Sequence, residues 1–194
     1  MPASLEPATT QLSELVAGTP ESALSNTTPC DIPVGALLDH IQSFAAAFTA
    51  AARKDQSGPT GPPPAPDASN LGADWRTAIP HALEELTAAW DEPDAWTGMT
   101  RIGGLDMPGE AVGVVALDEV VMHSWDLARA TGRPYDPDPQ ILEALTGFLT
   151  HMAEPEMVSA RVGLFGPVVA VPPDARPLDR VVALAGRDPG WSIS

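Results

Sequence analysis

The chain has little cysteine and little positive charge. Its 194 residues include one cysteine, so no internal disulfide can form and a reducing, cytoplasmic setting is expected. Ten Lys and Arg stand against 26 Asp and Glu, for a formal net charge of -16. Because binding to phosphate backbones and anionic membranes relies on clustered basic side chains, we expect neither nucleic acid nor a membrane as a partner. The acidic excess itself most simply favours solubility.

Long apolar runs are also missing. No apolar stretch approaches the length of a membrane-spanning helix, and the opening residues Met1-Pro2-Ala3-Ser4 lack the basic and apolar regions of a signal peptide. With 44% apolar residues the chain is long enough to bury one core. We therefore expect a single domain over residues 1–194.

Apolar residues recur at helical spacing in most of the chain. We expect Asp31 and Asp74 to cap the second and third helices with their side chains, and Gly132 to end the long fourth helix with left-handed backbone. Asp136-Pro137 should start the fifth helix. The expected helices cover residues 5–16, 33–54, 75–90, 108–131, 137–152 and 178–185.

The segments between these helices are rich in Pro and Gly. Residues 56–68 predict an exposed, low-complexity loop, and residues 91–107 predict a loop or small hairpin over one end of the helices. An irregular C-terminal extension is expected from about residue 160. Strand signals are confined to residues 96–107 and 168–171. The sequence therefore predicts an all-α four-helix bundle with a short additional C-terminal helix and an irregular tail.

A buried acid and imidazole lie within an apolar run, residues 112–127, of the long fourth predicted helix. Glu119 and His123 are four residues apart, so their side chains leave the same face about 5 to 6 Å from each other. In the second predicted helix, His40 lies beside the apolar stripe that contains Leu37 and Phe44. Two His and one carboxylate from two packed helices match a catalytic zinc set and equally the facial triad of non-haem iron.

Each of these residues also has a simpler interpretation. A lone His on an apolar helix face is more often a hydrogen-bonded core residue than a ligand, and Glu-x-x-x-His occurs by chance on helices. Asp126 either orients His123 through a hydrogen bond or faces solvent. Cys30 is interpreted as a structural thiol, since ten residues of helix would place it about 15 Å from His40. His81 and His151 are expected at the surface.

Five stretches of the chain resemble the DinB/YfiT-like metalloenzyme superfamily. The similarity is greatest to the branch of the mycothiol-dependent maleylpyruvate isomerase N-terminal metal-binding domain. The pairing of a Leu-Leu-Asp-His helix with a Glu-x-x-x-His-x-x-Asp-Leu-Ala-Arg-Ala-Thr-Gly helix is the most specific part. The stretches are Thr28-Pro29-Cys30 with Leu37-Leu38-Asp39-His40, residues 105–110, residues 117–132, Leu178-Asp179-Arg180, and residues 186–191.

The resemblance implies both a fold and a site. It implies an up-down-down-up bundle in which His40, Glu119 and His123 bind a divalent metal ion, zinc first, with nickel or iron as alternatives. It also implies a low-molecular-weight thiol such as mycothiol as cofactor. The chain departs from its relatives at Asp31-Ile32-Pro33, where a Trp is usual, so the entry to the site should differ. The isomerases also have a separate C-terminal domain for substrate, so we expect a related reaction rather than that isomerisation itself.

Three functions remain open from the sequence. The first is a thiol-dependent transferase or isomerase for small electrophilic substrates, and the second is a non-catalytic metal- or ligand-binding bundle in stress or detoxification. The third is a structural bundle whose polar trio forms a hydrogen-bonded core network. A homodimer is compatible with all three. Neither a Gly-rich phosphate loop nor a Ser-His-Asp pattern occurs, which excludes nucleotide hydrolysis and serine chemistry.

Overall fold

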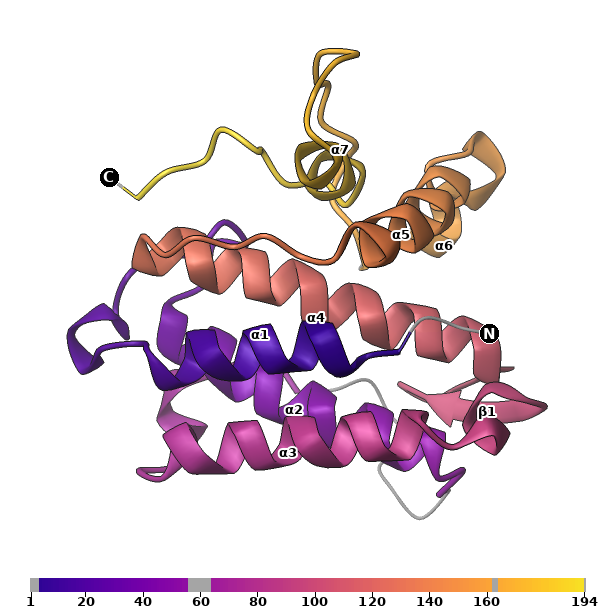
Figure 1. The fold of residues 1–194 in the computed structure, drawn as a ribbon, viewed down its shortest axis with the longest axis horizontal. Helices are drawn as coiled ribbons and strands as arrows, with labels where there is room; N and C mark the ends of the chain where they lie inside the picture. The colour runs from indigo at the N-terminus through magenta and orange to yellow at the C-terminus, as the bar shows by residue number, and fades with distance from the viewer. Residues whose placement is uncertain (1–3, 56–63, 162–163, 194) are drawn as a thin grey trace.

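A bundle of four helices forms the main body of the computed structural model, which describes residues 4–55, 64–161 and 164–193. Helix α1 covers Glu6–Ala17, α2 covers Val34–Ala52, α3 covers Trp75–Trp90 and α4 covers Gly109–Thr131. Helix α1 packs against α3 and α4, and α2 packs against the same two helices (Figure 1). The expected all-α class is confirmed.

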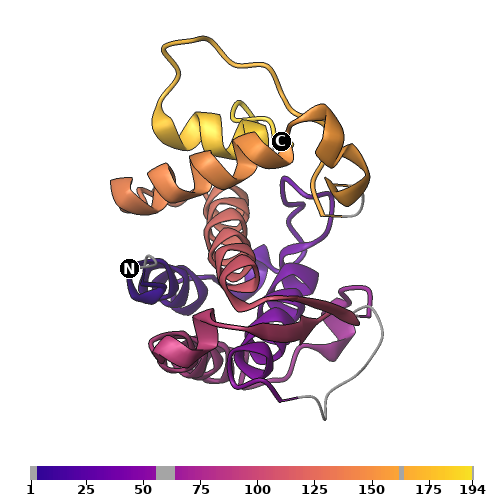
Figure 2. The ribbon, with the colours of Figure 1, turned by 90° about the vertical axis from the view of Figure 1, so that its right-hand side faces the viewer.

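A smaller layer covers the outer side of α4. It contains α5 (Pro139–Met152), the short α6 (Val158–Arg161) and α7 (Pro177–Leu184), and α5 packs against both α4 and α7 (Figures 1 and 2). Helix α4 is therefore enclosed by the bundle on one side and by the C-terminal helices on the other. As a result nearly every residue from Ala116 to Ala128 is buried, including the acidic Asp118 and Asp126.

The segment between α3 and α4 forms the small hairpin that the sequence allowed. Strands β1 (Met99–Ile102) and β2 (Leu105–Pro108) are antiparallel, and Ile102 pairs with Leu105 across a turn of two glycines. Short 3-10 helices cover Glu21–Ala23, Ala68–Asn70, Pro93–Trp96 and Pro155–Met157. Residues 168–171, the other strand signal, form no strand.

Helix ends agree with the sequence less well than helix cores. Gly132 ends α4 in the left-handed conformation (φ 67), as expected. Asp74 occupies the N-cap of α3 as expected, but its side chain makes no capping hydrogen bond, and the cap expected from Asp31 is wrong. Pro33 occupies the N-cap of α2 with extended backbone, while Asp31 lies in the preceding turn with φ 61. Asp74 has φ -96 and ψ 12 rather than the extended backbone that aims a capping side chain over the first turn.

The start of α5 differs from the predicted boundary. Helix α5 begins at Pro139, and the Asp138 side chain accepts a hydrogen bond from the Gln140 backbone N–H, so the start lies two residues later than Asp136-Pro137. Most of the Pro/Gly-rich loop expected at 56–68 lies outside the described residues.

No helix within the described ranges combines the length and apolar character that a membrane crossing requires.

Candidate metal centre

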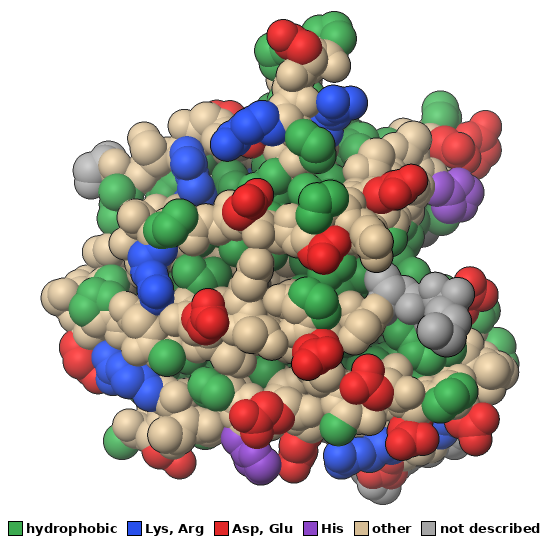
Figure 3. All heavy atoms as spheres, in the orientation of Figure 1, with side chains coloured by type: hydrophobic (Ala, Val, Ile, Leu, Met, Phe, Trp, Pro, Cys, Tyr) green, Lys and Arg blue, Asp and Glu red, His purple; other side chains and the backbone are tan. Residues whose placement is uncertain are grey.

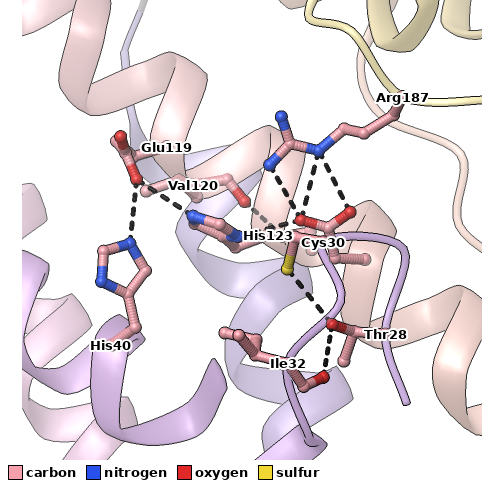
Figure 4. A network of polar contacts seen from close by, with 10 residues as sticks. Thr28, Cys30, Ile32, His40, Glu119, Val120, His123 and Arg187 are labelled. Atoms are coloured by element: carbon pink, nitrogen blue, oxygen red, sulfur yellow. Dashed lines mark hydrogen bonds and ion pairs between the residues drawn. The ribbon is translucent and has the colours of Figure 1, made fainter. Parts of the chain in front are cut away.

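The structure brings His40, Glu119 and His123 together between α2 and α4 (Figure 4). Glu119 Oε2 lies 3.4 Å from His40 Nε2 and 3.1 Å from His123 Nε2. One ligand atom from each of the three side chains lies within 4.8 Å of the other two. The three donors therefore surround a common point, although they come from positions about eighty residues apart in the chain.

The spacing of these donors suits a small divalent ion. Ligands about 2.0 to 2.1 Å from a tetrahedral zinc ion lie about 3.3 Å from one another, and octahedral ligands at a similar distance lie about 3.0 Å apart. The two contacts of Glu119 Oε2, 3.1 and 3.4 Å, fall in this range. The assignment of the three residues as metal ligands remains a prediction, and these distances fit zinc, nickel and iron alike.

Glu119 Oε2 is a buried oxygen atom without a hydrogen-bond partner. The atom is buried and accepts no hydrogen bond of proper geometry, although two imidazoles are close by. Burial alone raises the pKa of the Glu119 carboxyl, but His123 and His40 outweigh it and hold that pKa below its ordinary value. The buried Oε2 of Glu119 thus lies between two ring nitrogens without a hydrogen bond, which is a position that a bound cation can take.

One side of this group is accessible from solvent. The side chains of His40 and Glu119 are each 24% exposed, whereas His123 is 10% exposed. On the inner side, the Phe44 ring stacks on His123 with ring centroids 5.9 Å apart and meets His40 edge-on at 5.7 Å. A cation held here would keep coordination positions toward solvent and an apolar wall behind it.

Asp126 is buried and fixes the second nitrogen of His123. Asp126 Oδ2 lies 3.0 Å from His123 Nδ1, so of the two interpretations of Asp126 the structure supports the orienting one. Burial lowers the pKa of His123, but the hydrogen bonds of Asp126, Cys30 and Glu119 outweigh it and raise that pKa well above its ordinary value. Asp126 Oδ2 and Glu119 Oε2 therefore lie next to the two ring nitrogens of His123, at 3.0 Å from Nδ1 and 3.1 Å from Nε2.

Arg187 is the residue of this site that the sequence did not identify. Its guanidinium donates to both carboxylate oxygens of Asp126, with Nε at 3.1 Å from Oδ1 and Nη2 at 3.0 Å from Oδ2. Burial raises the pKa of Asp126, but Arg187 and His123 outweigh it and lower that pKa. No spacing rule links Arg187 to Asp126, because the contact depends on how the C-terminal extension folds back.

Cys30 lies close to the same site, so the distance argument that placed it about 15 Å away is wrong. The residues before Pro33 form a turn rather than a helix, and this turn brings Cys30 Sγ next to His123 and Asp126. Cys30 Sγ also lies 3.1 Å from Thr28 Oγ1. Because Arg187 already pairs with Asp126 there, a cation on this side of His123 would meet a guanidinium, and we assign no metal to this second group.

The remaining histidines lie far from this chemistry, as expected. His81 is exposed on α3 beside Glu84 and Glu85, and His151 is exposed on α5 with Nδ1 3.1 Å from Glu154 Oε2. Both histidines lie at the surface beside carboxylates, and both provide controls for substitutions of His40 and His123.

The mostly helical structure is consistent with the all-α fold of a DinB-like domain. The chain belongs to the mycothiol maleylpyruvate isomerase N-terminal domain family, whose model matches residues 5–128. No curated protein and no solved structure matches the chain significantly. The family match covers α1 to α3 and most of α4, which includes the three candidate ligands and Asp126, and it ends before the extension that carries Arg187.

Proposed function

We propose that the protein is a divalent-metal-dependent thiol transferase or isomerase that acts on small electrophilic substrates. The observation that carries this proposal is the convergence of His40 Nε2, Glu119 Oε2 and His123 Nε2 on one point between α2 and α4, where the side chains of His40 and Glu119 are partly exposed. Membership of a mycothiol-related family supports a mycothiol-like thiol as the second substrate or cofactor. The proposed ion is zinc, with nickel or iron as alternatives.

A divalent ion at such a site supplies Lewis acidity that lowers the pKa of a bound thiol or water. The residues of the chain prepare the site for it. Glu119 and His40 provide donors at the accessible side, and His123 provides the inner donor. Asp126 accepts from His123 Nδ1 and so directs the Nε2 lone pair outward once Nε2 has lost its proton. Phe44 excludes water from the inner side of both rings.

The surface agrees with a small-molecule role. On the face shown in Figure 3, acidic side chains are spread over the molecule rather than gathered into one patch. The net charge of -16 opposes binding to polyanions. The proposal therefore includes a small thiol and a small substrate as partners, a cytoplasmic location, and no nucleic-acid or membrane partner. It is compatible with a homodimer.

The test combines metal analysis with a turnover assay. Protein purified without an affinity tag should contain about one zinc equivalent and consume a low-molecular-weight thiol in the presence of electrophiles only when loaded with metal. The His40→Ala and Glu119→Gln proteins should lose both properties. The His81→Ala protein, which removes an exposed histidine, should keep both.

The other outcomes distinguish the alternatives. Stoichiometric metal that is lost in His40→Ala, without any thiol consumption, would contradict catalysis and identify a non-catalytic metal-binding bundle. Absence of metal affinity in the wild-type protein would identify the three side chains as a hydrogen-bonded core network.

A further inference from the structure

Arg187 lies in a tail segment that turns back onto α4 after α7. Gly186 makes this turn with φ 86, and its N–H donates to the Ala183 carbonyl, while the Arg187 N–H donates to the Val182 carbonyl. A side chain at Gly186 would place its Cβ 2.5 Å from the Gly166 backbone, so glycine is needed both for the turn and for the close approach. The turn directs Arg187 toward Asp126.

The tail is held on α4 by a second arginine that does not touch Asp126. Arg129 Nη2, near the end of α4, donates to the carbonyls of Pro189 and Trp191. Trp191 N–H in turn donates to the Asp188 carbonyl. Docking of the tail and the contact with Asp126 therefore depend on different side chains, which allows the two to be separated experimentally.

Arg187, Asp126 and His123 form a continuous chain of hydrogen bonds that ends at the candidate metal centre (Figure 4). Asp126 has 0% exposed side chain, so no water layer surrounds its carboxylate. A planar guanidinium that contacts both oxygens fixes the orientation of the carboxylate as well as its charge. Because the carboxylate is fixed, its Oδ2 can accept a hydrogen bond from Nδ1 of His123 in only one orientation of the imidazole ring.

We propose that Arg187 is a positioning residue for the candidate metal centre. By fixing Asp126 it fixes the His123 ring with hydrogen on Nδ1, which leaves Nε2 as the donor for a divalent cation. The C-terminal tail, which lies outside the family match, thus completes a site whose ligands lie inside it. This inference rests on the proposed metal site, but the ring orientation and tautomer exist without metal and can be measured separately.

The test compares Arg187→Met and Arg187→Lys with two controls. Arg180→Met removes an exposed arginine of α7, and Arg129→Met removes the tail contact without touching Asp126. Zinc affinity is measured by competition with a chelator. The His123 tautomer is measured in zinc-free protein at a pH above its titration by long-range proton–nitrogen NMR. Thermal unfolding shows whether each variant is folded.

Arg187→Met should lower zinc affinity about tenfold or more and give a mixture of His123 tautomers. Arg187→Lys keeps the charge but not the planar fork, so its zinc affinity should lie between those of the wild type and Arg187→Met. Both controls should stay within about twofold of the wild type, since neither contacts Asp126.

Two results would overturn the role of Arg187. One is a folded Arg187→Met or Arg187→Lys protein with the wild-type tautomer and zinc affinity. The other is an equal loss in Arg129→Met, which would assign the effect to tail docking alone. A wild-type protein without zinc affinity would instead refute the proposed function, and the tautomer in zinc-free protein would still decide the role of Arg187.

Discussion

At the residue scale, the site depends on which nitrogen of His123 carries hydrogen. Replacing Asp126 by Asn puts an NH2 group in place of one acceptor, and this group faces either Arg187 or His123 Nδ1. A donor opposite Nδ1 favours the tautomer with hydrogen on Nε2, which cannot bind metal. We expect Asp126→Asn to lower zinc affinity about ten- to 100-fold, measured by chelator competition.

A matched control for this change exists on the surface. Glu154 contacts His151 Nδ1 at the same spacing of three residues, but both side chains are exposed. Glu154→Gln should leave zinc affinity within about twofold of the wild type, because it is far from the three ligands. Equal zinc affinity in Asp126→Asn and wild type would remove Asp126 from the metal centre.

Asp118 gives a pH-dependent prediction for the metal-free protein. Burial, and then the charge of Glu119, raise its pKa from 3.8 to about 7, and Arg187 and His123 oppose this rise only in part. Between about pH 4 and pH 7 the carboxyl of Asp118 therefore carries a proton in the folded protein, whereas the same carboxyl has lost its proton in the unfolded chain. By linkage, this group reduces stability progressively as pH rises from about 4 to 7, and the reduction is complete above that range.

The Asp118→Asn protein lacks this titration. The free energy of unfolding of Asp118→Asn minus that of the wild type should rise by about 2 to 4 kcal/mol from pH 4 to pH 7. Above pH 7 this difference should stay constant. Urea unfolding at a series of pH values, with chelator present, measures the difference. A difference that does not change with pH would show that Asp118 titrates normally in the folded protein.

Single residues were predictable where local spacing determines their direction. His40, Glu119 and His123 were identified because helical periodicity places them on apolar faces, and the structure indeed brings them together. Arg187 lies in the stretch 186–191 that resembles the family, but its contact with Asp126 was not predictable because it joins residues 61 positions apart across two helical layers. Cys30 was misplaced because a helix was assumed where the chain makes a turn.

At the element scale, α4 is the most closely packed helix around the site, and Gly113 shows how little space surrounds it. Gly113 lies under Trp90, the last residue of α3, and Trp96 of the 3-10 helix that follows, and a Cβ there would lie 2.4 Å from the Trp96 ring and 2.8 Å from the Trp90 ring. The rings are fixed, because each indole N–H donates to a backbone carbonyl, that of Phe48 for Trp90 and that of Trp90 for Trp96. Little room exists for a larger residue.

Gly113→Ala should therefore lower the free energy of unfolding by about 1 to 3 kcal/mol despite the better helix propensity of Ala. Gly147 of α5 is the control, since a Cβ there meets nothing within 4 Å. Gly147→Ala should raise stability by about 0.5 to 1 kcal/mol. Chemical denaturation of both variants tests the pair, and a stabilised Gly113→Ala protein would contradict the packing described.

Element cores were predictable and element ends were not. Apolar periodicity placed α1, α3 and α7 within about two residues, because burial of one helix face is a sum over many positions. Asp31 does not cap α2, and Asp74 occupies the N-cap of α3 without a side-chain hydrogen bond, because a side-chain cap depends on the backbone angles of one residue, which neighbouring turns decide. The burial of α4 on both sides was not visible, because it depends on where α5 and α7 pack.

At the scale of the whole molecule, the bundle carries the three candidate ligands and the segment after α7 carries Arg187, which we propose orients one of them. His40, Glu119 and His123 lie on α2 and α4, whereas Arg187 follows α7. Two parts of the chain that are separate in sequence thus meet at one imidazole. Divalent metal should accordingly stabilise the fold, since it binds the folded protein and not the dispersed ligands of the unfolded chain.

The most direct measurement of the central claim is the anomalous X-ray scattering of crystals of the untagged protein loaded with zinc. We expect one strong peak at about 2.0 to 2.2 Å from His40 Nε2, Glu119 Oε2 and His123 Nε2. A peak at Cys30 or at exposed carboxylates alone, or no peak at these three residues in fully loaded protein, would contradict it.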